Sequence, residues 1–283
     1  MPALSPTVVT ALRAAHAAAG VQRRFFRRLE RVDYKGRNDP VTEADRAAED
    51  TIVGILQEAY PSHAILGEEG GRRGRGAHTW LVDPLDGTSN YARGIPWFAT
   101  SLALHEEPAG LTLGVIMNPM LGEVYAAERG RGAFSAFLAD LPTDPAGWDD
   151  LIPWRRLHVS AVASLRDAAF ATGFPHDVTE TRVNLDHFVD VRLEAAIVRS
   201  LGSAALALAA VAAGHLDGYW EIGPKAWDFA AGMLMVEEAG GRISDLRGRP
   251  VPATGDAGQL VATNGALHDA TIAVLARGGS GLD

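Results

Sequence analysis

Cysteine is absent from this 283-residue sequence. Disulfides, zinc–thiolate sites and thiol nucleophiles are therefore excluded. Long apolar runs are also missing, because the longest one, residues 204–213, is about half of the roughly 18 residues that a membrane-spanning helix needs. The N-terminal residues lack the basic and then apolar order of a secretory signal. We therefore expect a cytoplasmic protein that makes no membrane contact.

Positive charge is also scarce. The sequence has 26 Lys and Arg against 35 Asp and Glu, a formal net charge of −9. A general nucleic-acid-binding protein carries a basic face that neutralises phosphates, so we expect no nucleic-acid partner. A phosphorylated small molecule remains a possible substrate if metal ions supply positive charge locally. The hydrophobic content of 47% is ordinary for a globular protein, and the length suits one large domain or two closely packed halves.

Capping residues and apolar periodicity predict six helices. Ser5 followed by Pro6 opens the first helix, and Thr42 with Asp45 forms a capping-box pattern that opens the second. The Gly240-Gly241 pair ends a later one. The expected helices cover residues 5–29, 42–59, 178–191, 203–213, 227–239 and a last stretch from about 267.

Strands are predicted on both sides of a long acidic, proline-bearing excursion at residues 135–154. We expect the basic, glycine-rich residues 70–76 to form a mobile flap or a solvated linker. Short strands that alternate with helices of ten or more residues in the second half indicate a layered α/β structure. The expected strands cover residues 64–67, 98–105, 111–117, 123–127, 157–160, 168–172, 196–199, 218–221 and 259–262.

The rest of the chain is best placed around residues 80–90. Leu81 and Val82 predict the end of a buried strand, and Pro84 cannot donate to a ladder, so strand pairing should stop there. Asp83 and Asp86 should then leave the sheet together. Residues 87–89 predict the opening of a helix, where free backbone N–H groups favour an anion.

Two carboxylates beside free N–H groups attract cations and phosphate oxygens, and one Mg²⁺ ion can connect the two. The carbonyl oxygen of Leu85, between the aspartates, is a further candidate ligand. A purely structural interpretation stays open: Asp86 begins an Asx turn, and Asp83 caps a loop. Asp45 and Asp228 can likewise be explained as helix-capping residues.

The motif Asp83-Pro84-Leu85-Asp86-Gly87-Thr88 is similar to the signature of the inositol monophosphatase family of metal-dependent phosphatases. Asp228, followed by eleven residues and then Gly240-Gly241, resembles the family's second signature. The resemblance runs from Lys35 past Gly241, because several motifs occur in the family's order. The further matching motifs are residues 39–45, 67–69, 199–205, 221–223 and 227–228.

The resemblance implies an α/β (α+β) fold, a layered αβαβα sandwich of the inositol monophosphatase and fructose-1,6-bisphosphatase type. It implies one domain over residues 1–283. The approximate halves are residues 1–160, with an antiparallel sheet and the metal motif, and residues 161–283, with a smaller α/β layer. Where the family makes a short hairpin, this chain has the excursion at 135–154, whose role the sequence leaves open.

The resemblance also implies a two-metal site. Glu68, Asp83 and the Leu85 carbonyl would hold one Mg²⁺, and Asp83 would bridge to a second ion held by Asp86 and Asp228. A weaker third ion would lie near Glu68. The catalytic residues would be Thr88, Asp45 and Glu68: the Thr88 hydroxyl, polarised by Asp45, would orient a metal-activated water for in-line attack on the phosphate.

The implied reaction is hydrolysis of a small phosphorylated polyol, with inositol monophosphate as the leading substrate. Histidinol phosphate, fructose 1,6-bisphosphate and 3′-phosphoadenosine 5′-phosphate are the same-family alternatives. Inhibition by Li⁺ and a homodimer are further expectations, and a catalytically idle homologue with a regulatory binding role is the alternative of another class. The implied substrate-binding residues are Lys35, Asp86, Gly87, Thr88, Ser89, Gly202, Ser203, Ala204, Glu221 and Asp228.

Overall fold

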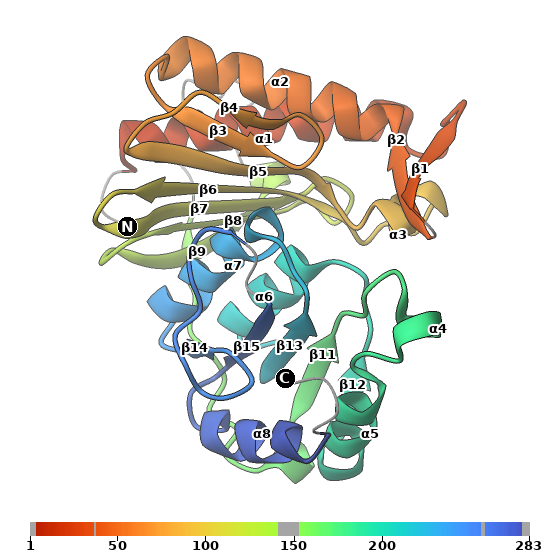
Figure 1. Ribbon diagram of the computed structural model, residues 1–283. Helices are drawn as coiled ribbons and strands as arrows, with labels where there is room; N and C mark the ends of the chain where they lie inside the picture. Colours follow the sequence, from red (N-terminus) through yellow and green to blue (C-terminus); the bar gives the residue numbers. More distant parts are fainter. Residues whose placement is uncertain (1–3, 37, 141–152, 256–257, 279–283) are drawn as a thin grey trace.

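The computed structural model describes residues 4–36, 38–140, 153–255 and 258–278. Helices and sheets alternate in five layers, α-β-α-β-α, as expected (Figure 1). An eight-stranded sheet has the strand order β10-β9-β8-β7-β6-β5-β3-β4, and a five-stranded sheet has the order β12-β11-β13-β15-β14. No helix in the described ranges is long and apolar enough to cross a membrane.

The first half of the chain supplies two long helices and the large sheet. The predicted start of α1 at Ser5 and the capping box of α2 are confirmed, because Ser5 accepts from the N–H of Val8 and Thr42 pairs reciprocally with Asp45. The elements are α1 (Pro6–Phe25), β1 (Val32–Gly36), β2 (Asp39–Thr42), α2 (Glu43–Ala59), β3 (Ala64–Gly67), β4 (Gly71–Arg73), β5 (His78–Asp86), α3 (Thr88–Ala92), β6 (Ala99–Glu106), β7 (Gly110–Asn118), β8 (Glu123–Glu128), β9 (Gly132–Phe137) and β10 (Arg155–Arg156).

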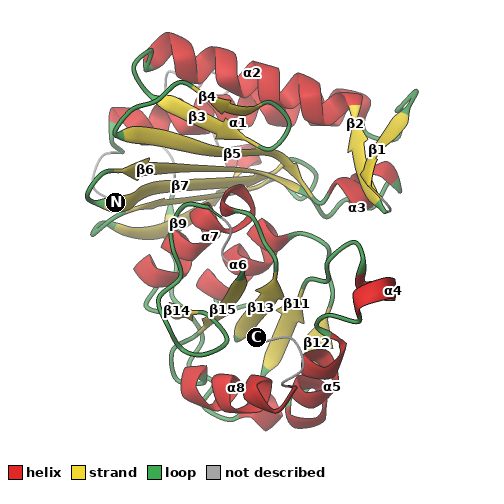
Figure 2. Ribbon diagram, viewed as in Figure 1, coloured by secondary structure: helices red, strands yellow, loops and turns green. Residues whose placement is uncertain are grey.

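The second half forms the smaller sheet and the helices on both of its faces (Figure 2). Its predicted alternation of strands and helices is confirmed, with an additional edge strand, β14. The elements are β11 (Ala169–Thr172), α4 (Val178–Thr181), α5 (Leu185–Glu194), β12 (Ile197–Arg199), α6 (Ala204–Ala212), β13 (Gly218–Ile222), α7 (Ala226–Glu238), β14 (Arg242–Ser244), β15 (Gln259–Thr263) and α8 (His268–Leu275).

Several local predictions were wrong. Residues 71–73 do not form a mobile flap, because strand β4 pairs with β3 and Arg73 lies 3.5 Å from the buried carboxylate of Glu49. Helix α1 ends at Phe25, and the predicted helix at 178–191 is interrupted where Arg182 and Asn184 take positive φ. The expected strand at 157–160 is absent; β10 at Arg155–Arg156 takes its place.

The acidic excursion begins later than predicted. Residues 135–137 belong to β9, which pairs with both β8 and β10. A short 3₁₀ helix, Leu138–Asp140, follows, and residues 141–152 lie outside the described part of the chain. Strand β1 and strand β2, which the sequence did not predict, form a separate two-stranded hairpin.

The middle helical layer is the most tightly packed part of the fold. All nine residues of α6 are buried, because the helix lies between the two sheets, and α7 lies beside it (Figure 1). Gly114 of β7 lets the backbone of Ala231 approach closely, since a Cβ at Gly114 would lie 2.8 Å from the Ala231 oxygen. Gly232 of α7 has the same function toward α6, because its Cβ would lie 2.4 Å from that of Leu208.

We expect Gly232→Ala to lower the free energy of unfolding. Overpacking of a filled core lowers stability by about 1–3 kcal/mol, and the higher helix propensity of alanine offsets up to about 1 kcal/mol of that loss. The matched control is Gly54→Ala in α2, where nothing lies within 4 Å of the new Cβ. That variant should be more stable than wild type by about 1 kcal/mol. Urea unfolding of both variants measures the difference, and equal shifts would show that the contact between α6 and α7 is not tight.

Candidate active site

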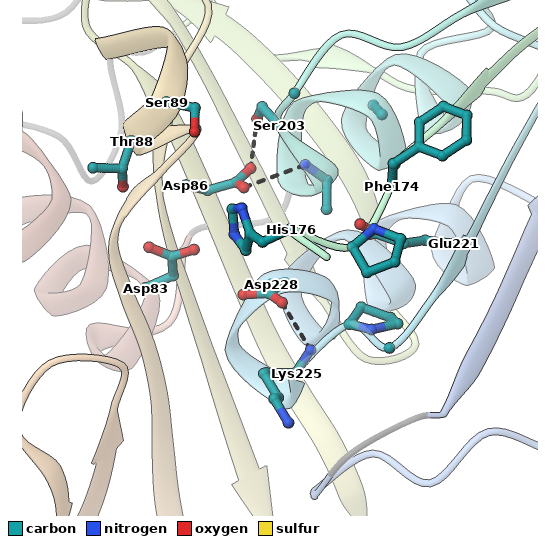
Figure 3. Close-up of a pocket in the computed structure, with 18 of the residues that line it drawn as sticks. Asp83, Asp86, Thr88, Ser89, Phe174, His176, Ser203, Glu221, Lys225 and Asp228 are labelled. Carbon is teal, nitrogen blue, oxygen red and sulfur yellow. Dashed lines mark hydrogen bonds between the residues drawn. The ribbon is translucent and has the colours of Figure 1, made fainter. Parts of the chain in front are cut away.

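A cavity of about 560 Å³ lies where β5 and α3 face α6, α7 and the loop after β11. Figure 3 shows Asp83 and Asp86 directed toward this space from β5, and Asp228 from the start of α7. All of the sequence-predicted site residues except Asp45 line the cavity. They are Lys35, Glu68, Asp83, Leu85, Asp86, Gly87, Thr88, Ser89, Gly202, Ser203, Ala204, Glu221 and Asp228.

The sequence predicted that strand pairing stops at Pro84, but β5 continues to Asp86. Its pairing with β6 is irregular between Asp83 and Asp86 and resumes at the pair Asp86–Ala99. Within the irregularity, the N–H of Leu85 donates to Asp83 Oδ1 over 2.9 Å, and the carbonyl of Pro84 accepts from the fully buried Gln22 over 2.7 Å. The bulge therefore holds both aspartates at the cavity without ending the sheet.

Gly87 joins this bulge to helix α3. Its φ of 98° is in the left-handed region that glycine adopts readily. A Cβ there would also lie 3.0 Å from the carbonyl oxygens of both Gly202 and Trp97. Thus Gly87 has a structural reason to be glycine: the second half of the chain approaches the turn through Gly202.

Asp86 is held by donors from the start of α6. The hydroxyl of Ser203 donates to its Oδ2, as does the N–H of Ala205 over 2.8 Å. The N–H of Ala204 donates to Oδ1 over 3.3 Å. Burial raises the pKa of Asp86 to about 6, although these donors oppose the rise. Ser203 and Ala204 therefore lie in the cavity wall, as predicted, and there they contact a carboxylate.

Like charges are concentrated around Asp83. Burial raises the pKa of Asp83 well above its ordinary value, and the charges of Glu68, Asp86 and Asp228 raise it further. Burial also raises the pKa of Asp228, whose Oδ2 accepts the N–H of Lys225 over 2.7 Å at the start of α7. Asp228 is thus the third residue of α7 and accepts the N–H of the N-cap residue Lys225, whereas its alternative interpretation placed Asp228 itself at the N-cap. It also lines the cavity.

Lys35 of the β1–β2 hairpin partly neutralises this charge. Its Nζ lies 2.8 Å from Glu68 Oε1 and 2.6 Å from Glu69 Oε1. Burial lowers the pKa of Lys35, but its interactions with the two glutamates outweigh that effect, so the net pKa lies above the ordinary value. Both adjacent glutamates therefore reach one ammonium group, although of the two only Glu68 lines the cavity.

Asp45 and Thr88 form a hydrogen-bonded pair behind the cavity. Asp45 is 1% exposed; its Oδ2 caps α2 through the N–H and hydroxyl of Thr42, and its Oδ1 lies 2.8 Å from the Thr88 hydroxyl. Burial raises the pKa of Asp45. The Thr88 hydroxyl also lies 2.9 Å from the Leu85 carbonyl. Asp45 therefore combines the capping role with a direct contact to Thr88.

On the opposite wall, Glu221 contacts Tyr219. The phenol of Tyr219 donates to Glu221 Oε2, while a Cβ at Gly173 would lie 2.1 Å from Glu221 Oε1. Burial raises the pKa of Glu221 to about 7, against the opposing hydrogen bond from Tyr219. The carboxyl group thus fits tightly between Gly173 and a phenol, neither of which the sequence had indicated.

The loop after β11 supplies cavity residues that the sequence analysis missed. Phe174, Pro175 and His176 line the cavity, and His176 Nε2 lies 3.6 Å from Asp39 Oδ1 of the β1–β2 hairpin. Lys225 lines it as well. Their position immediately after a strand of an α/β sheet is the one signal that could have identified 174–176, since such loops commonly carry binding residues.

The donor set fits a hard divalent cation by its chemistry. Four carboxylates and the Leu85 carbonyl offer only oxygen ligands. Burial and, to a smaller extent, the neighbouring carboxylates raise the pKa of Asp83, and a bound cation would oppose both effects. Among the described residues, however, no three acidic or histidine side chains converge tightly enough to hold an ion as they stand. Protein donors now occupy these groups: Lys35 pairs with Glu68, Ser203 with Asp86, and the N–H of Lys225 with Asp228.

The inositol monophosphatase family profile matches residues 3–279. The Nus factor SuhB of Pseudomonas aeruginosa is 42% identical over 258 residues, which cover 87% of each chain. The inositol-1-monophosphatase of Rhizobium meliloti is 43% identical over 252 residues, covering 87% of this chain and 86% of the relative. The crystal structure of the extragenic suppressor protein suhB from Bartonella henselae superposes with a TM-score of 0.84 at 37% identity, covering 96% and 98% of the two chains.

The raised pKa of Asp86 predicts a pH-dependent stability effect in metal-free protein. The folded pKa of about 6 lies above the ordinary value of 3.8, so the folded state binds an extra proton between these values, and stability falls as pH rises through that window. We therefore expect the stability of Asp86→Asn relative to wild type to increase by about 1–2 kcal/mol from pH 5 to pH 8 in EDTA. Urea unfolding across this range measures the increase, and a pH-independent difference would contradict it.

Proposed function

The chain belongs to the inositol monophosphatase family, and on that premise we propose that it is a Mg²⁺-dependent phosphomonoesterase that hydrolyses a small phosphorylated polyol, with inositol monophosphate as the leading substrate. One observation carries the proposal: four acidic groups from three separate segments, the turn after β3, strand β5 and helix α7, line a single cavity, and Thr88, whose hydroxyl is hydrogen-bonded to Asp45, lines it too. Burial of several neighbouring carboxylates is costly, and a purely structural role does not require it.

The metal-binding residues are Glu68, Asp83, Asp86 and Asp228, together with the Leu85 carbonyl. Two or three Mg²⁺ ions would supply Lewis-acid stabilisation of the negative charge that develops on the phosphoryl group. Binding at Glu68 requires that its carboxylate exchange part of its contact with Lys35. The Lys35 ammonium, 2.8 Å from Glu68, would then remain close enough to neutralise substrate charge.

Thr88 and Asp45 position the attacking water. The carboxylate of Asp45 accepts a hydrogen bond from the Thr88 hydroxyl, which leaves the hydroxyl oxygen free to accept a hydrogen bond from water. Asp45 is held by Thr42 and cannot turn away without losing the cap of α2. The N–H groups of Gly87, Thr88 and Ser89, at the start of α3, would donate to phosphate oxygens on the other side of the reaction centre.

The opposite wall would recognise the alcohol part of the substrate. Glu221 offers a carboxyl group at which a substrate lacking hydroxyls would leave hydrogen bonds unmade, and Gly202, Ser203 and Ala204 line the cavity with it. A polyol phosphate is therefore favoured over 3′-phosphoadenosine 5′-phosphate. Histidinol phosphate and fructose 1,6-bisphosphate remain the closest competitors.

A phosphate-release screen of the purified protein tests the proposal. With Mg²⁺ we expect the largest kcat/KM for inositol monophosphate, and lower values for histidinol phosphate, fructose 1,6-bisphosphate and 3′-phosphoadenosine 5′-phosphate. EDTA should abolish release, and Li⁺ should inhibit it by competing at the Asp86–Asp228 metal site. No Mg²⁺-dependent release from any of the four compounds would refute the phosphatase proposal and favour a binding role.

Removing the Thr88 hydroxyl should slow the chemical step. We expect Thr88→Val to lower kcat by about 10²–10⁴-fold, with little change in KM, because loss of a group that transfers a proton or orients the attacking water usually has an effect of this size. Thr88→Ser keeps the hydroxyl and should retain most of the activity. Thr51→Val is the matched control, because the Thr51 hydroxyl bonds only its own helix through the Ala47 carbonyl. Equal kcat values for Thr88→Val and wild type would eliminate Thr88 from the mechanism.

A further inference from the structure

Glu49 is a buried acid outside the cavity. It lies on α2 one turn after Asp45, is 2% exposed, and does not line the cavity. Residues four apart share a helix face, so α2 presents Asp45 and Glu49 toward the same side of the fold. A carboxylate is rarely buried so completely unless its oxygens accept hydrogen bonds. The donors of these hydrogen bonds therefore show which segment Glu49 holds in place.

Both carboxylate oxygens of Glu49 bind the turn after β3. The N–H of Glu69 donates to Oε2 over 2.8 Å, and the N–H of Gly70 donates to Oε1 over 2.7 Å. Arg73 of β4 approaches Oε1 at 3.5 Å. Backbone N–H donors to a buried ionised group make strong, directional hydrogen bonds. Glu49 therefore fixes the turn immediately after Glu68.

The two glycines around this turn leave space for Glu49. Neither Gly67 nor Gly70 has a positive φ, so backbone conformation does not require glycine at either position. A Cβ at Gly67 would lie 2.6 Å from Glu49 Oε2, and one at Gly70 would lie 2.5 Å from Glu49 Oε1. The glycines on both sides of Glu68 and Glu69 are thus required by the Glu49 carboxylate, which comes from a different segment of the chain.

Glu68 is anchored on both sides of its Cα. Its own N–H donates to the Val82 carbonyl of β5 over 3.1 Å, next to Asp83. The next two N–H groups donate to Glu49. Its side chain, in contrast, contacts the 32%-exposed side chain of Lys35 on the separate β1–β2 hairpin. The backbone contacts, more than Lys35, therefore determine where the Glu68 carboxylate is directed.

We propose that Glu49 is a positioning residue that directs Glu68 into the cavity and so raises the affinity of the site for a divalent cation. This inference rests on the proposed metal-dependent function. Through Asp45 and Glu49, helix α2 supports two separate parts of the site: Asp45 contacts Thr88 after β5, and Glu49 holds the Glu68 turn after β3. Substitution of groups that orient metal ligands typically weakens metal binding about 10–100-fold.

The test is Glu49→Gln, which keeps the shape of the side chain but replaces one acceptor oxygen by an NH₂ group that cannot accept. With Mn²⁺ as the probe, titrated by electron paramagnetic resonance, we expect the dissociation constant to rise about tenfold or more. The kcat at saturating Mg²⁺ should stay within about twofold of wild type, because the ligands themselves are intact. Hydrogen exchange at the Glu69 and Gly70 amides should accelerate.

The matched control is Asp50→Asn on the same helix. Asp50 has a 77%-exposed side chain and lies 3.9 Å from the same Arg73, so the variant removes one acidic charge beside Arg73 without touching the turn. It should bind Mn²⁺ as wild type does. An equal loss of affinity in Asp50→Asn and Glu49→Gln would overturn the positioning role, because general electrostatics would then explain both.

Gly67→Ala perturbs the same contact while Glu49 is retained. The new methyl group must displace the Glu49 carboxylate, so Mn²⁺ affinity should fall as it does in Glu49→Gln. If Glu49→Gln fails to fold, Gly67→Ala provides the test of the positioning role. Unchanged Mn²⁺ affinity in this folded variant would overturn the proposal. Wild-type protein that binds Mn²⁺ but hydrolyses no phosphate ester would refute the proposed function alone, since the affinity comparison still tests Glu49.

Discussion

Negative charges gathered in a buried cavity raise one another's free energy, and the rest of the structure accommodates this constraint. Four of the carboxylates at the cavity accept hydrogen bonds from nearby donors: the N–H of Leu85 for Asp83, Ser203 and the N–H of Ala205 for Asp86, the N–H of Lys225 for Asp228, and Lys35 for Glu68. These donors lie at a strand bulge, at two helix starts and on a hairpin, the places where backbone or side-chain donors are not used in regular ladders. The burial still leaves the pKa of Asp83 and Asp228 raised, so the donors offset the repulsion only in part. That residual charge is the feature a divalent cation would neutralise.

Two of the acidic side chains both stabilise a helix start and contact the site. Asp45 closes the capping box of α2 and bonds Thr88, and Asp228 accepts the N–H of Lys225 at the start of α7 while facing the cavity. The hydrogen bond that each aspartate makes at its helix start restrains its side-chain torsions, so the carboxylate keeps one orientation. The sequence left open whether each residue caps a helix or belongs to the site, and the geometry is compatible with both roles at once.

How far the sequence could predict the fold depended on the range of the interactions. Antiparallel strands β6, β7 and β8 were predictable because local turns join them, and α6 because its apolar run is continuous. The strand β4 was taken for a flap because its Gly-Arg composition carries no strand signal, and its partner β3 supplies the pairing. The bulge at Pro84 was missed for a similar reason: Gln22, more than sixty residues away along the chain, binds the Pro84 carbonyl. The motif resemblance identified residues that line the cavity, whereas Tyr219, His176 and Glu49 act through partners that no local pattern indicates.

The outer strands of the two sheets share one chemical feature. The large sheet ends in β4 and β10, and the small sheet in β12 and β14; each of these strands is two or three residues long and carries at least one arginine, at Arg72, Arg73, Arg155, Arg156, Arg199 and Arg242. A second molecule approaching edge to edge with a like strand would bring guanidinium groups together over a very short ladder. Short length and like charge at these four edge strands therefore disfavour edge-to-edge growth into β-aggregates.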